Sequence, residues 1–288
     1  FLYLEITPDI YQRTASVLIK DETNNSMSEI SAFEDLGLFK TGTNVNNEIR
    51  AFRSPFLISD VIKSLDLDVS YKIKKGLQYV ELYIESPVIL SFPDSPENTS
   101  FSFELKLLPD NKFSFSDFEG MDKKKDYEIT GNFSDTILTP VGLVIVRPSF
   151  FFSEYYYHKP IRITKSDVSS VANTFLHKTT VALSGINTTI INLTIRDESM
   201  RRSDDFLNTL ISVYNEKRIE DNSRIAINTS NFINERLLVI EKELGGIDSD
   251  IEVFKSSNLL TDVQAAGERF MNESSEYSSQ AFDLNNQR

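Results

Sequence analysis

Seven apolar residues in the last quarter of the chain recur at alternating spacings of four and three residues. They are Ile233, Leu237, Ile240, Leu244, Ile247, Ile251 and Phe254. This heptad pattern places them on one face of a helix and is typical of a coiled coil. Gly245 and Gly246 interrupt it at a cost of about 1 kcal/mol each relative to alanine. We therefore predict a truncated helical arm over residues 229–288, with a bend or a break at the glycine pair.

The two segments that flank the middle of the chain each combine a strand with helices. Alternating apolar residues between Tyr11 and Ile19 predict a half-buried strand, and Ser54-Pro55 opens a helix with apolar residues at helical spacing. A second alternating strand, Thr189 to Arg196, precedes a helix for which Asp197, Ser203 and Asp204 are candidate caps. Residues 1–69 and 185–228 are therefore expected to pair into one α/β layer.

Residues 70–184 have a different pattern, with short alternating runs such as Phe101 to Leu107 separated by turn sequences such as Pro109-Asp110-Asn111. Several short strands with turns between them predict an inserted, β-rich, sandwich-like module. The expected fold class is accordingly α+β: an α/β layer made by the two ends of the domain, a β-rich insertion and a long C-terminal helical arm.

Composition excludes several kinds of function. The chain has 288 residues, no cysteine and a formal net charge of -13. The charge argues against nucleic acid as a partner because phosphate binding needs a surplus of Lys and Arg. Without cysteine there are no disulfides, thiolate metal sites or thiol nucleophiles. No apolar stretch is long enough to cross a bilayer. The apolar opening Phe1 to Leu4 fits either an ordinary strand or a chain cut just after a membrane helix.

The motifs of common enzymes are missing from the sequence. Lys40-Thr41 lacks the glycine spacing of a phosphate-binding loop, and His158 and His177 stand outside any metal-ligand spacing. No pair of acids stands out as glycosidase carboxylates. We therefore expect no catalytic residue, no cofactor and no metal. The aromatic run over residues 150–157 fits either a glycan contact or a buried strand, and the sequence favours the strand.

The order of the elements resembles the chain-length determinant (Wzz-like) family of polysaccharide co-polymerases. The resemblance rests on YQRTASVLIKDE (Tyr11 to Glu22), NVNNEIRAFRSPFLISDVIKSLDL (Asn44 to Leu67), TTIINLTIRDESMRRSDDFLNTLISVYNEK (Thr188 to Lys217) and TSNFINERLLVIEKELGGIDSDIEVFKSSNLL (Thr229 to Leu260). Residues 70–184 depart from the simple family pattern. They resemble the larger versions found with exopolysaccharide-export tyrosine autokinases (Wzc-like).

The resemblance implies a non-enzymatic, architectural role in polysaccharide chain length and export of capsule or exopolysaccharide. It implies a ring-shaped homo-oligomer that contacts the polymerase, the outer-membrane export channel or polysaccharide. It also implies a location on the periplasmic side of the bacterial inner membrane, with flanking membrane helices outside this chain. In the autokinase branch a cytoplasmic tyrosine kinase follows. The candidate subunit or glycan contacts are Arg50, Arg53, Arg201 and Arg202, which also fit solvated helix faces.

Three other functions compete with this interpretation. A surface lectin or adhesin would use the β-rich module to bind carbohydrate and the helical arm as a stalk. A glycosidase would depend on one specific Asp or Glu. A periplasmic efflux adaptor would need a second long heptad helix, which residues 20–66 do not supply.

Overall fold

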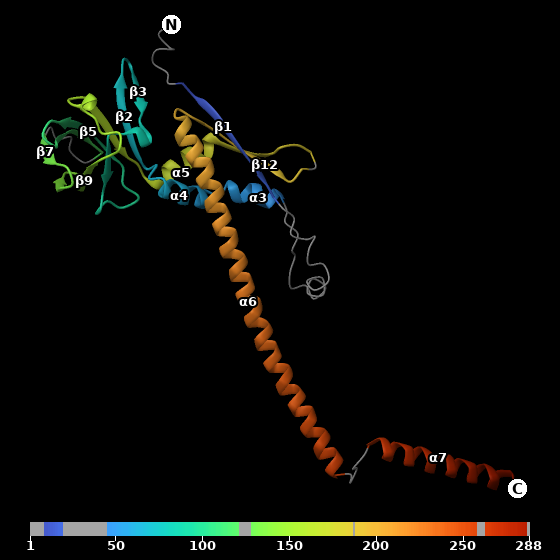
Figure 1. Cartoon of the computed structure of the whole chain (residues 1–288). Helices are drawn as coiled ribbons and strands as arrows, with labels where there is room; N and C mark the ends of the chain where they lie inside the picture. The colour runs from blue at the N-terminus through green and yellow to red at the C-terminus, as the bar shows by residue number, and fades with distance from the viewer. Residues whose placement is uncertain (1–8, 20–44, 121–127, 187, 258–262, 287–288) are drawn as a thin grey trace. The chain divides into compact units, whose positions relative to one another are not determined.

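The computed structural model describes residues 9–19, 45–120, 128–186, 188–257 and 263–286 (Figure 1). The chain divides into two compact units, Phe1–Arg218 and Ile219–Arg288. Within these described ranges, the first unit contains two hydrophobic cores and the second is helical. Mixed helix and sheet with a long helix near the C-terminus agrees with the predicted α+β class.

The first core forms around a three-stranded antiparallel sheet. Its strands lie in the order β1 (Tyr11–Leu18), β12 (Ile190–Asp197) and β11 (Thr179–Leu183). Strands β1 and β12 pair over eight residues with Ala15 opposite Leu193, and Figure 1 shows them side by side. Strands that are far apart in sequence therefore meet here, as the expected α/β layer requires.

Helices complete this core: α3 (Val45–Phe52), α4 (Pro55–Ser64), α5 (Val168–Lys178) and the start of α6 (Met200–Ser257). Pro55 occupies the first turn of α4, where its missing N–H is not needed, but the Ser54 side chain makes no capping hydrogen bond. The α4 residues with helical spacing are the buried ones: Leu57, Ile58, Val61 and Ile62. Helical periodicity thus selects the packed face of α4.

The second core lies between two antiparallel sheets. The larger has the order β3 (Gln78–Glu81), β2 (Val69–Lys75), β10 (Pro160–Lys165), β5 (Phe101–Leu108), β6 (Lys112–Glu119) and β7 (Ile129–Asn132). The smaller has the order β4 (Val88–Ser91), β9 (Gly142–Pro148) and β8 (Thr136–Thr139). Alternate residues of β5 are buried, and Phe103 contacts Phe115 of β6 with ring centroids 5.1 Å apart. A Cβ on Gly131 would lie 1.8 Å from Ile137 Cδ1, so a larger residue there would require the Ile137 side chain to shift.

The predicted β-rich segment covers residues 70–184, but its last part belongs to the first core. Helix α5, which the sequence patterns did not predict, begins at Val168 and is capped by Asp167, whose carboxylate accepts the Ser170 N–H at 2.9 Å. Val168, Ala172 and Phe175 of α5 and Val181 of β11 are buried with the first core. The apolar residues of α5 recur at helical spacing, so its packing face was visible in the sequence and was overlooked because the segment was assigned to the β-rich module.

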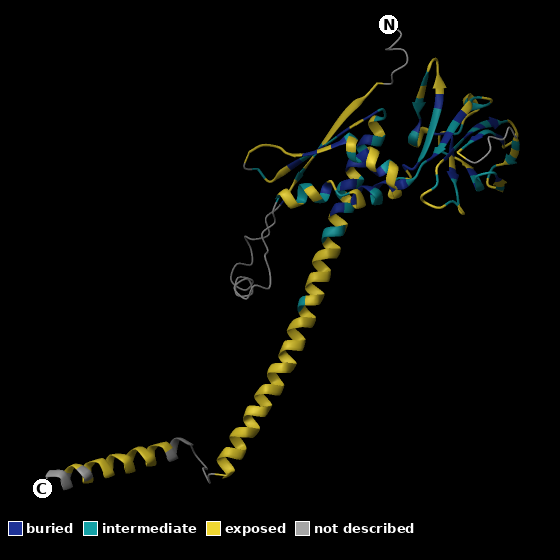
Figure 2. Cartoon of the chain, turned by 180° about the vertical axis from the view of Figure 1, so that it is seen from behind, coloured by how far each residue is buried: buried dark blue, intermediate teal, exposed yellow. Residues whose placement is uncertain are grey.

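Helix α6 runs from Met200 to Ser257 without interruption. The predicted break at Gly245 and Gly246 is therefore wrong, because the helical residues on both sides carry the ladder of hydrogen bonds through the pair. A bend at the pair stays a prediction. Helix α7 (Val263–Asn286) follows farther along the chain. Figure 2 shows that α6 residues of the second unit are largely exposed.

One expectation about location needs correction. The resemblance placed the chain at the bacterial inner membrane, but within the described ranges no helix combines the length and apolarity that a bilayer crossing requires.

Candidate functional site

A buried cluster of charged side chains lies where β12 ends and α6 begins. The side chain of Asp197, the last residue of β12, is 0% exposed. Its two oxygens accept hydrogen bonds from Arg202 Nε at 2.6 Å and Nη2 at 3.0 Å, which is a two-point guanidinium–carboxylate contact. Lys178 Nζ, from the last turn of α5, donates to the same carboxylate at 2.7 Å. The cluster therefore ties three elements of the first core together.

Arg202 also reaches the second core. Its Nη1 lies 3.2 Å from Glu81 Oε2, and the Glu81 side chain is only 2% exposed. The Glu81 carboxylate further accepts the Ser70 hydroxyl at 2.5 Å and the N–H groups of Tyr71 and Tyr83 at 3.0 and 3.1 Å. One arginine thus connects buried carboxylates from both cores.

The first turn of α6 positions this arginine. The Ser199 hydroxyl accepts the Arg202 N–H at 3.2 Å, and the Ser203 hydroxyl donates to the Ser199 carbonyl at 2.9 Å. Ser199 therefore has the capping role that the sequence pattern assigned to Asp197, Ser203 or Asp204. Asp197 is used by the ion pair instead, and Asp204 pairs with Arg13 Nε at 3.2 Å.

The charges of the cluster are stable. Burial disfavours the charge on Asp197, but the hydrogen bonds and positive charges of Arg202 and Lys178 outweigh it and lower the pKa of Asp197 below its usual range. Burial acts against Arg202 too, yet Asp197 and Glu81 raise its pKa. Both groups stay ionised around neutral pH. The arrangement therefore suits a structural connection rather than proton transfer.

The four predicted arginines do not form one site. Arg202 is ion-paired, and its side chain is only 12% exposed. Arg50 on α3, Arg53 just after it and Arg201 on α6 are exposed. Their role as contacts stays a prediction. Sequence reasoning missed Glu81 and the pairing of Asp197, although an acid that ends a strand five residues before an arginine in the next helix is a visible signal.

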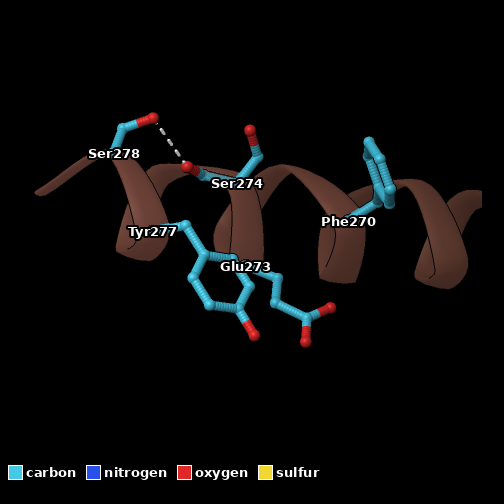
Figure 3. Close-up of a pocket in the computed structure, with 5 residues that line it drawn as sticks. All are labelled: Phe270, Glu273, Ser274, Tyr277 and Ser278. Carbon is cyan, nitrogen blue, oxygen red and sulfur yellow. Dashed lines mark hydrogen bonds between the residues drawn. The ribbon is translucent and has the colours of Figure 1, made fainter. Parts of the chain in front are cut away.

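Two other kinds of site find no support. Among the residues that the structure describes, no three His, Cys, Asp or Glu side chains come together as a candidate metal site. A shallow hollow on α7 is lined by Phe270, Glu273, Ser274, Tyr277 and Ser278. Figure 3 shows that all five lie along one helix, with the Ser278 hydroxyl bonded to the Ser274 carbonyl at 2.8 Å. A hollow with walls from a single helix does not enclose a ligand.

The heptad residues of α6 form an exposed apolar stripe. We define the stripe as Ile233, Leu237, Ile240, Leu244, Ile247 and Ile251, which are 38% to 56% exposed. Apolar side chains repeated at heptad spacing are the surface through which helices associate. The described residues of the second unit leave this stripe open to solvent.

Comparison with known proteins gives a distant relative. No family model matches the chain. The chain is 23% identical over 304 aligned positions to a protein named tyrosine-protein kinase ptk from Acinetobacter johnsonii. The alignment covers 99% of the chain and 40% of that protein, so the chain spans less than half the length of this relative. The similarity favours the tyrosine-kinase branch of the resemblance, while a chain-length determinant domain stays a prediction.

The comparison corrects a second expectation. The absence of enzyme motifs predicted a chain without enzymatic activity. The relative that aligns with 99% of it is named a tyrosine-protein kinase, so that expectation does not stand.

Proposed function

We propose that this chain is part of a tyrosine-kinase-type regulator of capsular or exopolysaccharide export, and that it controls polymer length through homo-oligomer assembly. The distant similarity to a tyrosine-protein kinase along 99% of the chain carries the proposal. At the level of the family, that similarity supports a role in polysaccharide export.

The structure suggests how assembly would use the two units. Buried ion pairs connect both cores of the first unit, which copies would pack against in this proposal. The exposed stripe on α6 offers each copy an apolar helix face, and burying it would release about 25 cal/mol per Å² of apolar surface. In this proposal the copies form a ring that organises the polysaccharide polymerase or the outer-membrane export channel.

The test is the length profile of surface polysaccharide. We would compare wild type, a strain without the gene, and a strain whose protein carries Ile240→Asp and Leu244→Asp. Two charges on the stripe disfavour helix association, so we expect dispersed or shortened polymers in both altered strains and a smaller assembly of the purified variant by analytical ultracentrifugation.

The matched control is Leu238→Asp, which changes an exposed leucine outside the stripe and should leave both readouts unchanged. Identical profiles in wild type and in the deletion strain, with no paralogue present, would remove the proposal. The carbohydrate-binding or adhesin function would then take its place, and the exposed aromatic rings of the β9–β10 connection are the observation that favours it.

A further inference from the structure

The connection between β9 and β10, residues 149–159, exposes aromatic rings from a well-packed segment. The exposed fraction is 95% for Phe150, 42% for Phe151 and 65% for Tyr155. Their neighbour Phe152 instead packs on Phe133 of the second core, with ring centroids 5.4 Å apart. Some aromatic residues of one short segment are thus anchored while others face solvent. This stretch is not the buried strand that the sequence favoured.

Hydrogen bonds hold this segment in one conformation. The Ser149 hydroxyl donates to the Ser86 carbonyl at 2.5 Å and accepts the Phe151 N–H at 3.0 Å. Farther along, the His158 N–H donates to the Leu107 carbonyl at 2.9 Å. The exposed rings are therefore presented by an ordered backbone, and a ligand that binds them does not have to order the segment first.

The rings have polar groups beside them. Lys159 Nζ lies over one face of the Tyr155 ring, 3.0 Å from its centre, so a ligand would stack on the opposite face. Glu154 and His158 are exposed in the same segment. The planes of Phe150 and Phe151 meet at 86°, with ring centroids 5.5 Å apart. The surface therefore combines aromatic faces with hydrogen-bond donors and acceptors, which suits a ligand ring that has apolar C–H faces and a polar edge.

A pyranose ring has these two properties. Its axial C–H bonds are slightly positive and stack on the negative face of an aromatic ring, while its hydroxyls bond to neighbouring polar groups. A stable protein interface needs about 800 Å² per partner, more than three rings provide. A net charge of -13 opposes contact with an anionic bilayer surface. The features of the segment fit sugar better than either of these partners.

We propose that Phe150, Phe151 and Tyr155 form a stacking surface for the pyranose rings of a polysaccharide. The proposal rests on the proposed function, because it names the polymer as a direct ligand of the same protein. Stacking uses axial C–H groups, which many pyranoses present on at least one face. The surface should therefore tolerate different sugars and bind each of them weakly.

The test is a titration of the full chain with two defined probes, cellohexaose (neutral) and hexagalacturonate (acidic). Saturation-transfer difference NMR reports which ring protons touch the protein. We expect saturation at the C–H protons of at least the neutral probe. We also expect about tenfold weaker binding, or more, for the double variant Phe150→Ala/Tyr155→Ala.

Phe270→Ala is the control, because it removes an exposed phenylalanine from α7, outside this segment. It should bind as wild type does, and circular dichroism checks that all variants fold. No saturation of either probe, or equal binding by the double variant, would overturn the proposal. So would co-sedimentation with phosphatidylglycerol vesicles that depends on Phe150 while neither sugar binds. The polysaccharide length profile is a separate measurement that does not depend on sugar binding by the purified chain. Failure of this proposal and failure of the proposed function can therefore be told apart.

Discussion

At the scale of single residues, the charges around Arg202 decide how the two cores of the first unit are held together. Two buried carboxylates, Asp197 and Glu81, face two cations, Arg202 and Lys178. Such clusters add little net stability when complete, but the loss of one member leaves an uncompensated charge in a poorly hydrated place. Arg202 touches both carboxylates and is therefore the member whose loss matters most.

Arg202→Met should destabilise the chain by about 3 to 5 kcal/mol, because Glu81 then lacks its cation and Asp197 retains only Lys178. The free energy of unfolding in urea, followed by circular dichroism, measures this loss. Arg201→Met is the control, since its side chain is exposed, and it should change stability by less than about 0.5 kcal/mol. Equal effects of the two substitutions would show that the cluster does not connect the cores.

At the scale of elements, α6 has two environments along one continuous helix. Near its start Phe206, Leu207, Leu210 and Tyr214 are buried, and Tyr214 stacks on Phe52 of α3 with ring centroids 4.1 Å apart. Beyond Arg218 its residues are mostly exposed, and a Cβ added to Gly245 or Gly246 would meet no atom within 4 Å. In that part, helix propensity rather than packing sets the local stability.

Gly245→Ala combined with Gly246→Ala should strengthen this part of α6. Alanine costs about 1 kcal/mol less than glycine at each helical position, and both sites have room for the methyl group. We expect a larger helical signal at 222 nm and less fraying on heating, measured by circular dichroism. Gly267→Ala on α7 is the reference, because it shows how much the helical signal rises for one glycine-to-alanine substitution at a site with room for the methyl group. A smaller helical signal in the double variant would contradict helix propensity as the determinant of stability in this part of α6.

At the scale of the first unit, the two sheets of the second core are connected to the first core through two neighbouring strands, β2 and β10. Val69 of β2 pairs with Lys165 of β10, and the Ser166 N–H donates to the Asp68 carbonyl at 2.8 Å. Lys165 and Asp68 also form an ion pair. The fully buried residues of the first core come from segments before and after residues 70–164, and Tyr83 is the inserted residue that packs against this core while partly buried.

Replacement of residues 70–164 by an Asn-Gly turn should therefore leave the first core folded. The paired positions of Val69 and Lys165 let a short turn close the gap. The loss of Glu81 beside Arg202 should cost roughly 1 to 3 kcal/mol. Thermal unfolding by circular dichroism should remain one cooperative transition at a lower midpoint. A variant without a cooperative transition would show that the two cores fold only together.

The periodicity of the sequence predicted most of the elements near the ends of the chain. A spacing of two residues predicted strands β1 and β12, and a spacing of 3.6 residues predicted helix α4. The heptad spacing of 3.5 residues predicted the long helix that contains Leu237. Helix α5 was missed although Val168, Ala172 and Phe175 recur at helical spacing, because residues 70–184 were assigned as a whole to the β-rich module. The predicted break at Gly245 was wrong because the prediction considered the low helix propensity of glycine and left out the helical residues on both sides of it.

What the sequence determined by itself is the set of local structures and their apolar faces, since side-chain period and turn chemistry act over a few residues. Only the tertiary structure decided which charges meet. Glu81 and Arg202 are 121 positions apart in the chain, and no local pattern marks either as the other's partner. It also decided that Phe152 is anchored while Phe150 faces solvent, because burial depends on what the rest of the chain brings to each side of a residue.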